Sequence, residues 1–380
     1  MVNKERLADL FDFLVRIDSE SKDEAKVCSE LKKILESMGA KVVVDDAGKA
    51  IGSNTGNLIA KFKGNKDVEP ICLCGHMDTV VPGKNIVPTL KNGIFTSDGT
   101  TILGADDKSA IAIIIETLKI LQENNLSYGP LEIVFTICEE IGLLGAKNFD
   151  INLIDSKFGY ILDSTDIDGI VTKAPGANCL KLKVIGKAAH AGAEPENGIN
   201  AISIASKAIA KLELGRIDEE TTCNIGKIKG GKAENIVPDL VTVSGEVRSH
   251  NKDKLALITD NIVKAFESVV NECQLKNHNE NLPALEVSIR SDFRSTNIPE
   301  DHKVVTLAKK AAKNLGRNFE SKTIGGGADA NIFFEKGLVF GVLGTGMMNV
   351  HTLDESIKLD DMVKLIELLL EVIKLHYKNG

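Results

Sequence analysis

The sequence predicts an α/β fold in two domains, with a small α+β domain inserted into a larger α/β sandwich. The chain has 380 residues, which is more than one hydrophobic core usually organises. Up to about residue 164, apolar strand patterns alternate with helical patterns, as in a mainly parallel sheet covered by helices. From about residue 176 the strand patterns alternate apolar and polar side chains, as half-exposed antiparallel strands do.

The first part of the chain alternates helices with strands. Helical spacing of apolar residues covers 4–17 and 22–38, and the second helix is expected to end at Gly39. The further elements expected here are strands at 40–46, 57–64 and 70–76, a long buried helix over 106–125, a strand at 131–140, a helix starting within 141–149, and a strand at 158–164.

The middle of the chain has a different order of elements. We expect a strand at 179–188, a helix at 197–214, two strands within 224–250, a helix at 253–273 and a strand at 284–293. From about residue 295, helix, strand and helix resume in the style of the first part. We therefore expect a larger domain formed by residues 1–176 and 295–380, and an inserted domain formed by residues 177–294.

Composition excludes several classes of partner. The net charge of −8 and a pI near 5.5 argue against nucleic acid and anionic membranes. The seven cysteines, an odd number placed mostly in apolar runs, suit reduced thiols better than disulfides. The acidic, amphipathic start of the chain does not resemble a signal peptide, and the apolar run 110–115 is too short to cross a bilayer. We expect a cytoplasmic protein.

The strand at 70–76 ends in His76, and Asp78 follows one residue later. Residues two apart lie on the same side of a strand, so this carboxylate can orient the imidazole as a metal ligand. The alternative is a strand end with a solvated aspartate.

Acidic residues recur where the other apolar strands stop. The set comprises Asp106, Asp107, Glu139, Glu140 and Asp163, with His351 much later in the chain. The carboxyl ends of parallel strands form one rim, where α/β proteins place their sites. Carboxylates about 4 Å apart repel one another by several kcal/mol, so either protons or cations must neutralise them. Three carboxylates and two histidines suit two divalent ions sharing a bridging carboxylate, with zinc, cobalt or manganese as candidates; the alternative is a scatter of helix caps and solvated acids.

The adjacent residues Glu139 and Glu140 suggest two different roles, metal binding and proton transfer. One carboxylate can bind metal while the other, held nearby, takes a proton from the attacking water. Asp106 and Asp107 cannot both be ligands without an unusual backbone.

Seven short motifs occur in an order that resembles the two-zinc exopeptidase and aminoacylase superfamily, and peptidase T-like proteins in particular. They are "GHMDTV", "GADDKSA", "CEEIGLLGA", "ILDS", "AAHAG", "GGGADAN" and "NVHTLDE", spread over nearly the whole chain. The resemblance implies a three-layer α/β/α zinc-exopeptidase catalytic domain with an inserted, ferredoxin-like α+β lid that often dimerises.

The resemblance also implies a role for individual residues. Zinc would be bound by His76, Asp106, Glu140, Asp163 and His351, with Asp106 bridging two ions, Asp78 orienting His76, and Glu139 as general base. A cis peptide bond between Asp106 and Asp107 is compatible with the resemblance. His190, in "AAHAG", would reach into the partner subunit's site in a homodimer and polarise the scissile carbonyl.

One position departs from peptidase T. The arginine that holds the substrate carboxylate just before the glycine-rich motif is replaced by Gly325. Arg248 could still bind a carboxylate and Asn235 a substrate backbone group. We therefore expect metal-dependent hydrolysis of amide bonds in small peptides, with N-acyl amino acids as an alternative substrate class and an inactive metal-binding scaffold as a second alternative.

Overall fold

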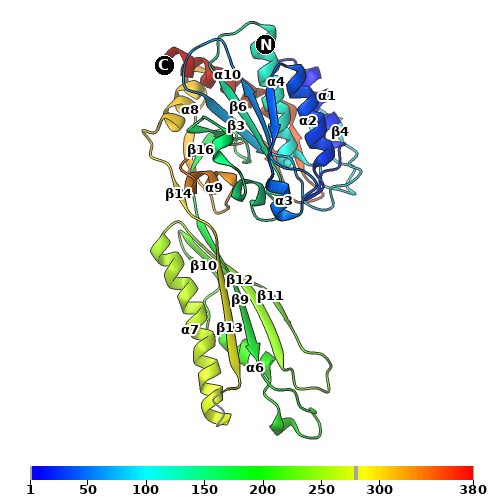
Figure 1. Cartoon of the computed structure of the whole chain (residues 1–380), viewed down its shortest axis with the longest axis vertical. Coiled ribbons are helices and arrows are strands. Elements are labelled where there is room, and N and C mark those ends of the chain that lie inside the picture. Colours follow the sequence, from blue (N-terminus) through cyan, green and yellow to red (C-terminus); the bar gives the residue numbers. More distant parts are fainter. Residues whose placement is uncertain (1, 278–280, 380) are drawn as a thin grey trace. The chain divides into compact units, whose positions relative to one another are not determined.

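The computed structural model describes residues 2–277 and 281–379, which form two compact units (Figure 1). The first unit comprises the residues up to Lys173, Asn297–Thr323, and those from Ala328 on. The second comprises Ala174–Thr296 and Ile324–Gly327. The sequence predicts the junctions at 176/177 and 294/295, and it does not anticipate that the glycine-rich segment Ile324–Gly327 joins the second unit.

The first unit is built around a sheet in the order β1-β2-β6-β3-β7-β16-β8. Its strands are β1 (Lys41–Val44), β2 (Leu58–Phe62), β3 (Ile71–His76), β6 (Leu131–Thr136), β7 (Phe158–Ile161), β8 (Gly169–Ala174) and β16 (Val339–Leu343), with β15 (Glu320–Thr323) paired to β8 and β14 at Thr296–Asn297. The central strands β6, β3, β7 and β16 run parallel to one another. Antiparallel pairs join β1 to β2, β2 to β6 and β8 to β16, whereas β15 is parallel to β8. The expected mainly parallel sheet is confirmed for its centre.

Helices cover both faces of this sheet. They are α1 (Lys4–Val15), α2 (Ala25–Ser37), α3 (Ala47–Ile51), α4 (Ala105–Glu123), α5 (Leu144–Lys147), α8 (Lys303–Asn314), α9 (Asp329–Glu335) and α10 (Leu359–Asn379), with a 3₁₀ turn at Ile151–Leu153. Phe340 of β16 stacks on Phe333 of α9, with ring centroids 5.0 Å apart. A side chain at Gly341 would instead meet Val304 of α8, on the opposite face. The unit therefore has the three layers expected of an α/β/α sandwich.

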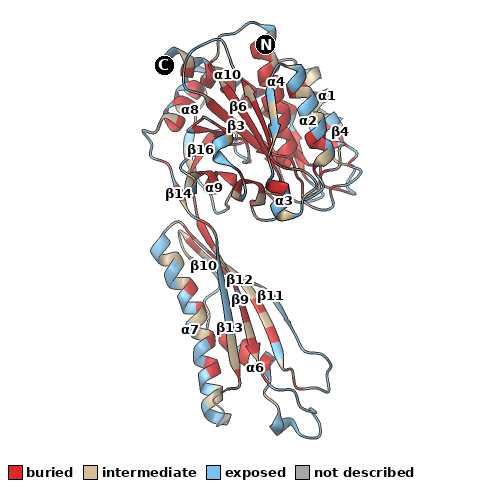
Figure 2. Cartoon of the chain, in the orientation of Figure 1, coloured by how far each residue is buried: buried red, intermediate tan, exposed pale blue. Residues whose placement is uncertain are grey.

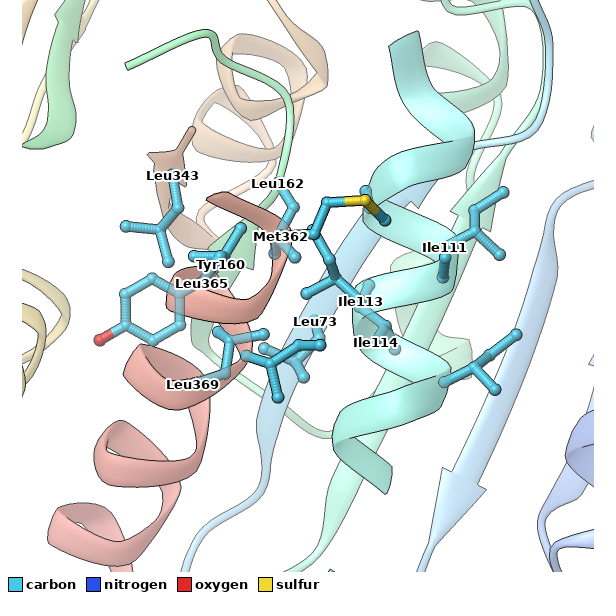
Figure 3. Close-up of a cluster of buried hydrophobic side chains, with 14 of the residues drawn as sticks. Leu73, Ile111, Ile113, Ile114, Tyr160, Leu162, Leu343, Met362, Leu365 and Leu369 are labelled. Carbon is cyan, nitrogen blue, oxygen red and sulfur yellow. The ribbon is translucent and has the colours of Figure 1, made fainter. Parts of the chain in front are cut away.

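The apolar core of the first unit lies between the sheet and the helices α4 and α10. Leu73 of β3, Ile113 of α4 and Leu365 of α10 belong to one buried cluster (Figure 3). Figure 2 shows the same pattern, with the central strands almost wholly buried. Almost every residue of α4 is buried, because both the sheet and other helices cover it. The strands whose carboxyl ends carry the candidate site residues are therefore part of this core.

The second unit is a small antiparallel sheet with two helices on one face. Its elements are β9 (Gly176–Ile185), α6 (Ala201–Ile209), β10 (Gly215–Asp218), β11 (Thr221–Gly230), β12 (Leu240–Ser249), α7 (Lys252–Asn277) and β13 (Ala284–Phe293), with a 3₁₀ turn at Pro195–Asn197. The sheet order is β10-β11-β12-β9-β13, all antiparallel. Leaving aside the short β10, this is the strand order of a ferredoxin-like α+β unit. A role as a lid stays a prediction.

The structure differs from the sequence prediction at several elements, which include α3, β8, β10 and α9. The strand expected at 131–140 ends at Thr136, and the residues up to α5 form a loop that carries both glutamates of interest. A small sheet of β4 (Thr89–Lys91), β5 (Ile94–Thr96), β17 (Met347–Met348) and β18 (Ser356–Lys358) is not anticipated. The sequence signal for the hairpin of β4 and β5 is the dipeptide Asn92–Gly93. Both residues have a positive φ, as the two-residue turn of a hairpin requires.

Among the described residues, none of the helices combines the length and apolar character needed to cross a bilayer.

Candidate active site

Three parallel strands bring the acidic motifs to one rim of the sheet. β3 lies between β6 and β7, and all three run in the same direction. His76 ends β3, Glu139 and Glu140 follow β6, and Asp163 follows β7. The rim therefore collects residues that are far apart in sequence.

Asp106 lies between two histidines. One carboxylate oxygen, Oδ1, is 3.1 Å from Nε2 of His76, and the other, Oδ2, is 3.1 Å from Nε2 of His351. Nε2 of His351 is also 3.0 Å from Oε1 of Glu140. A carboxylate that faces one imidazole with each oxygen has the arrangement needed to bridge two cations.

Two overlapping groups of side chains could hold metal ions. In each group the ligand atoms lie within 4.8 Å of one another: His76, Asp106 and Glu140 form one, and Asp106, Asp107 and Asp163 form the other. The Asp106–Asp107 peptide bond is cis, and both residues have non-helical φ and ψ within the first turn of α4. As a member of the second group, Asp107 is a candidate ligand that the sequence did not indicate.

Asp78 organises the rim through its buried carboxylate. The carboxylate accepts hydrogen bonds from the backbone N–H of Glu139 (2.9 Å), from that of Glu140 (3.2 Å) and from the hydroxyl of Ser21 (2.6 Å). Nδ1 of His76 lies closer to the backbone oxygen of Asp78 (2.9 Å) than to its carboxylate (3.4 Å). A proton on Nδ1 donated to that carbonyl leaves Nε2 free to bind an electrophile toward Asp106.

Crowding and burial shift the pKa values of the ionisable groups at the rim. Loss of hydration and the neighbouring Asp163 raise the pKa of Glu139 well above its usual range. Loss of hydration, with repulsion from Asp106, raises the pKa of Asp163 to about 7. Hydrogen bonds with Asp106 and Glu140 raise the pKa of His351 to about 10. Without a cation, the site therefore holds protons that a divalent ion would displace.

Two buried acids near the rim were not singled out as site residues. Glu355 accepts hydrogen bonds from the backbone N–H groups of Leu103 (2.8 Å), Gly104 (2.8 Å) and Asp106 (3.0 Å), and so holds the turn that carries Asp106. Asp329 accepts a bond from the Thr136 hydroxyl at the end of β6. Glu355 lies in the motif "NVHTLDE" and Asp329 in "GGGADAN". The sequence around a single acid in a loop does not indicate which distant group it will hydrogen-bond.

The remaining predicted residues belong to the second unit. Nδ1 of His190 accepts the backbone N–H groups of Gly192 (3.2 Å) and Ala193 (3.1 Å), which leaves the proton of the neutral ring on Nε2. The backbone N–H of Ala191 donates to the carbonyl of Asn235 at 2.9 Å, so the loops of His190 and Asn235 are neighbours.

Arg248 is engaged within its own unit. Its Nε and Nη2 each lie 3.1 Å from a carboxylate oxygen of Glu246, and its guanidinium lies 6.0 Å from the ring centroid of Phe293. Nη1 is 3.5 Å from the carbonyl oxygen of Gly325. The guanidinium of Arg248 therefore lies beside Gly325.

Comparison with known proteins gives a consistent result over nearly the whole chain. The family model "Peptidase family M20/M25/M40" matches residues 72–375. The uncharacterised protein YqjE of Bacillus subtilis is 41% identical, covering 98% of this chain and 99% of that protein. The crystal structure of aminopeptidase PepT from Bacillus cereus is 40% identical, with a TM-score of 0.89 and 98% of each chain covered. That of a tripeptidase from Staphylococcus aureus is 36% identical, with a TM-score of 0.92 and 100% of each chain covered.

Proposed function

Because the chain belongs to the M20/M25/M40 peptidase family, we propose that it is a metal-dependent exopeptidase that hydrolyses amide bonds in small peptides. The observation that carries the proposal is the Asp106 carboxylate, which faces His76 with one oxygen and His351 with the other. The similarity to an aminopeptidase and a tripeptidase supports peptides as the substrate class.

The donor set fits two divalent ions. His76, Asp106 and Asp163 would hold one ion, and Asp106, Glu140 and His351 the other. Next to Asp106 and Asp163, Oδ1 of Asp107 is buried without a hydrogen-bond partner in the described part of the chain, and a cation at this group would satisfy it. Imidazole and carboxylate ligands favour zinc, with cobalt and manganese as alternatives.

The chain's own residues would carry the proton transfers. Bound divalent ions would supply Lewis acidity, which makes water more acidic and a carbonyl more electrophilic. Glu139 would take the proton of the attacking water and later deliver it to the leaving amine, and its raised pKa suits that exchange. Asp78 would hold the Glu139 backbone in place, and the Nε2–H of His190 would donate a hydrogen bond to the developing oxyanion.

The substrate and assembly are further parts of the proposal. Gly325 removes the carboxylate-binding arginine of peptidase T, so Arg248 and Asn235 would take over recognition of the peptide. The protein would act as a homodimer in which His190 serves the partner's site. The seven free cysteines support a reducing cytoplasm as its location.

A substrate panel tests the function. Protein loaded with zinc, cobalt or manganese is expected to release amino acids from dipeptides and tripeptides faster than from N-acyl amino acids. Faster cleavage of the acyl compounds would move the protein to the deacylase alternative. No turnover on either class by fully loaded protein would support the scaffold alternative.

Metal removal and re-addition test the cofactor. Protein stripped with a chelator is expected to bind two zinc ions per chain, measured by calorimetry and elemental analysis. The raised pKa of Asp163, about 7, means that protons compete with metal below that pH. Affinity should therefore rise between pH 6 and pH 8, with release of protons. Saturation at one ion per chain would contradict the proposal.

Asp163→Ala should distinguish the two ion sites. Its carboxylate is assigned to one ion only, so affinity for that ion should fall at least about tenfold while the other ion binds nearly as before. Asp166→Ala, which removes an exposed acid three residues away, is the matched control. Equal weakening of both sites would show that the ligands are wrongly divided.

A further inference from the structure

The loop that carries Glu139 and Glu140 is held by side chains from three distant segments. Four successive backbone N–H groups, from Ile137 to Glu140, each donate to a side-chain oxygen. The acceptors are Oδ1 of Asn57 (3.1 Å), Oε1 of Glu24 (3.0 Å), Oδ1 of Asp78 (2.9 Å) and Oδ2 of Asp78 (3.2 Å), in chain order. These N–H groups are not used in a helix or a strand, so the side chains of Asn57, Glu24 and Asp78 determine the backbone conformation of this loop.

Glu24 is an unusual member of this group. It occupies the N-cap position of α2, yet its side chain makes no capping hydrogen bond. Its fully buried carboxylate turns inward and accepts from both the N–H and the thiol of Cys138, at 3.0 and 3.2 Å. It also accepts from the N–H of Lys22 and the hydroxyl of Ser53. Burying a carboxylate costs free energy unless its hydrogen bonds are satisfied. The contacts of Glu24 therefore indicate a role in holding the Cys138 loop, and not only at the start of α2.

Cys138 is the residue at which the chain turns from β6 toward the site. It has a φ of +51°, in the left-handed region that non-glycine residues rarely occupy. Such a conformation typically costs about 1–3 kcal/mol and persists only when surrounding contacts impose it. Two hydrogen bonds to Glu24 hold Cys138 from a distant segment, and the N–H of Leu144, at the start of α5, donates to its carbonyl oxygen at 3.0 Å. Without the bonds to Glu24 the backbone could relax and rotate the next residue, Glu139.

We propose that Glu24 is a positioning residue for catalysis, which acts by holding Cys138 in its left-handed conformation and so aiming the carboxylate of Glu139. The inference rests on the proposed role of Glu139 as general base. A displacement of about 1 Å in a catalytic group can cost on the order of 100-fold in rate. Loss of Glu24 should therefore lower kcat much more than it changes KM or metal content.

Three substitutions and one control test this role. Glu24→Ala is expected to lower kcat about 10- to 100-fold with KM within about threefold and two ions still bound. Glu24→Gln should restore most of kcat, because its amide oxygen can accept from Cys138 while its NH₂ group donates to the Ser53 hydroxyl. Glu24→Asp, which keeps the charge but withdraws it by one methylene, should fall between them and provides a milder change if the alanine variant does not fold.

Glu132→Ala is the matched control. Glu132 is also buried, lies at the other end of β6, and accepts from the N–H groups of Asp155 and Ser156 and the hydroxyl of Ser156. Its loss should lower the melting temperature as much as that of Glu24 but leave kcat unchanged. Equal losses of kcat in the two alanine variants would overturn the proposal, as would wild-type kcat in a folded Glu24→Ala or Glu24→Asp protein.

A double-mutant cycle separates positioning from general damage. In a Glu139→Gln background, Glu24→Ala should lower the residual kcat by less than about twofold, because the group it aims is already gone. If Glu24→Ala lowered kcat in this background as much as it does in the wild type, Glu24 would act through a group other than Glu139. Full activity of Glu139→Gln alone would instead refute the general-base assignment, whatever Glu24 does, so the two failures are distinguishable.

Discussion

Glu139→Gln is expected to lose most peptide turnover while it still binds two metal ions. Glutamine has the same shape as glutamate but cannot accept the proton of the attacking water. General acid–base catalysis typically contributes about 100- to 10,000-fold, so kcat should fall by that factor with little change in KM. Steady-state kinetics on the best peptide of the panel, with metal content measured on the same samples, would show it.

Glu140→Gln is the natural comparison for this variant. The two glutamates are adjacent and Asp78 holds both backbones, but only Glu140 contacts His351, at 3.0 Å. Glu140→Gln should lose metal affinity as well as activity, and excess metal should recover part of its turnover. A Glu139→Gln protein that recovers with excess metal, or that keeps wild-type kcat, would reassign the base.

His190→Ala is expected to cut kcat about 100- to 1,000-fold and to spare metal content, which is the usual effect of removing one oxyanion donor. The exposed imidazole is pre-oriented, because its Nδ1 accepts two backbone N–H groups and its Nε2 carries the proton. Lys187→Ala, an exposed change in the same segment, should leave kcat unchanged. Single-turnover kinetics would assign the loss to the chemical step.

Mixing variants tests whether His190 acts across a dimer. Subunits that lack His190 and subunits that lack Glu139 should form heterodimers with one complete composite site and recover part of the activity. Recovery should depend on subunit exchange, followed with labelled chains. Mixtures that exchange subunits and stay inactive, or an active monomer, would contradict a shared site.

Much of the fold follows from local patterns. The alternation of strands and helices up to Asp163 predicts a mainly parallel sheet, and the change to half-exposed strands after it predicts a second, antiparallel unit. The first prediction is confirmed for the centre of the sheet, and the later strands form an antiparallel sheet, because hydrophobic periodicity records which face of each element is buried. The resemblance to peptidase T-like members of the family is confirmed as well.

The sequence by itself also indicated that acids gather at the strand ends, because strand direction in a parallel sheet decides which ends meet. It could not decide how Asp107, Glu24 or Glu355 act. Asp107 lies near Asp163, which is distant in sequence. Glu24 and Glu355 accept hydrogen bonds from backbone groups 114 and 249 residues away, at Cys138 and Asp106. Hydrogen bonds to the main chain leave no pattern in the partner's residue type, since every residue except proline offers the same N–H group. Only the tertiary structure determines which buried carboxylate meets which loop, and hence how Glu139, the proposed general base, is held.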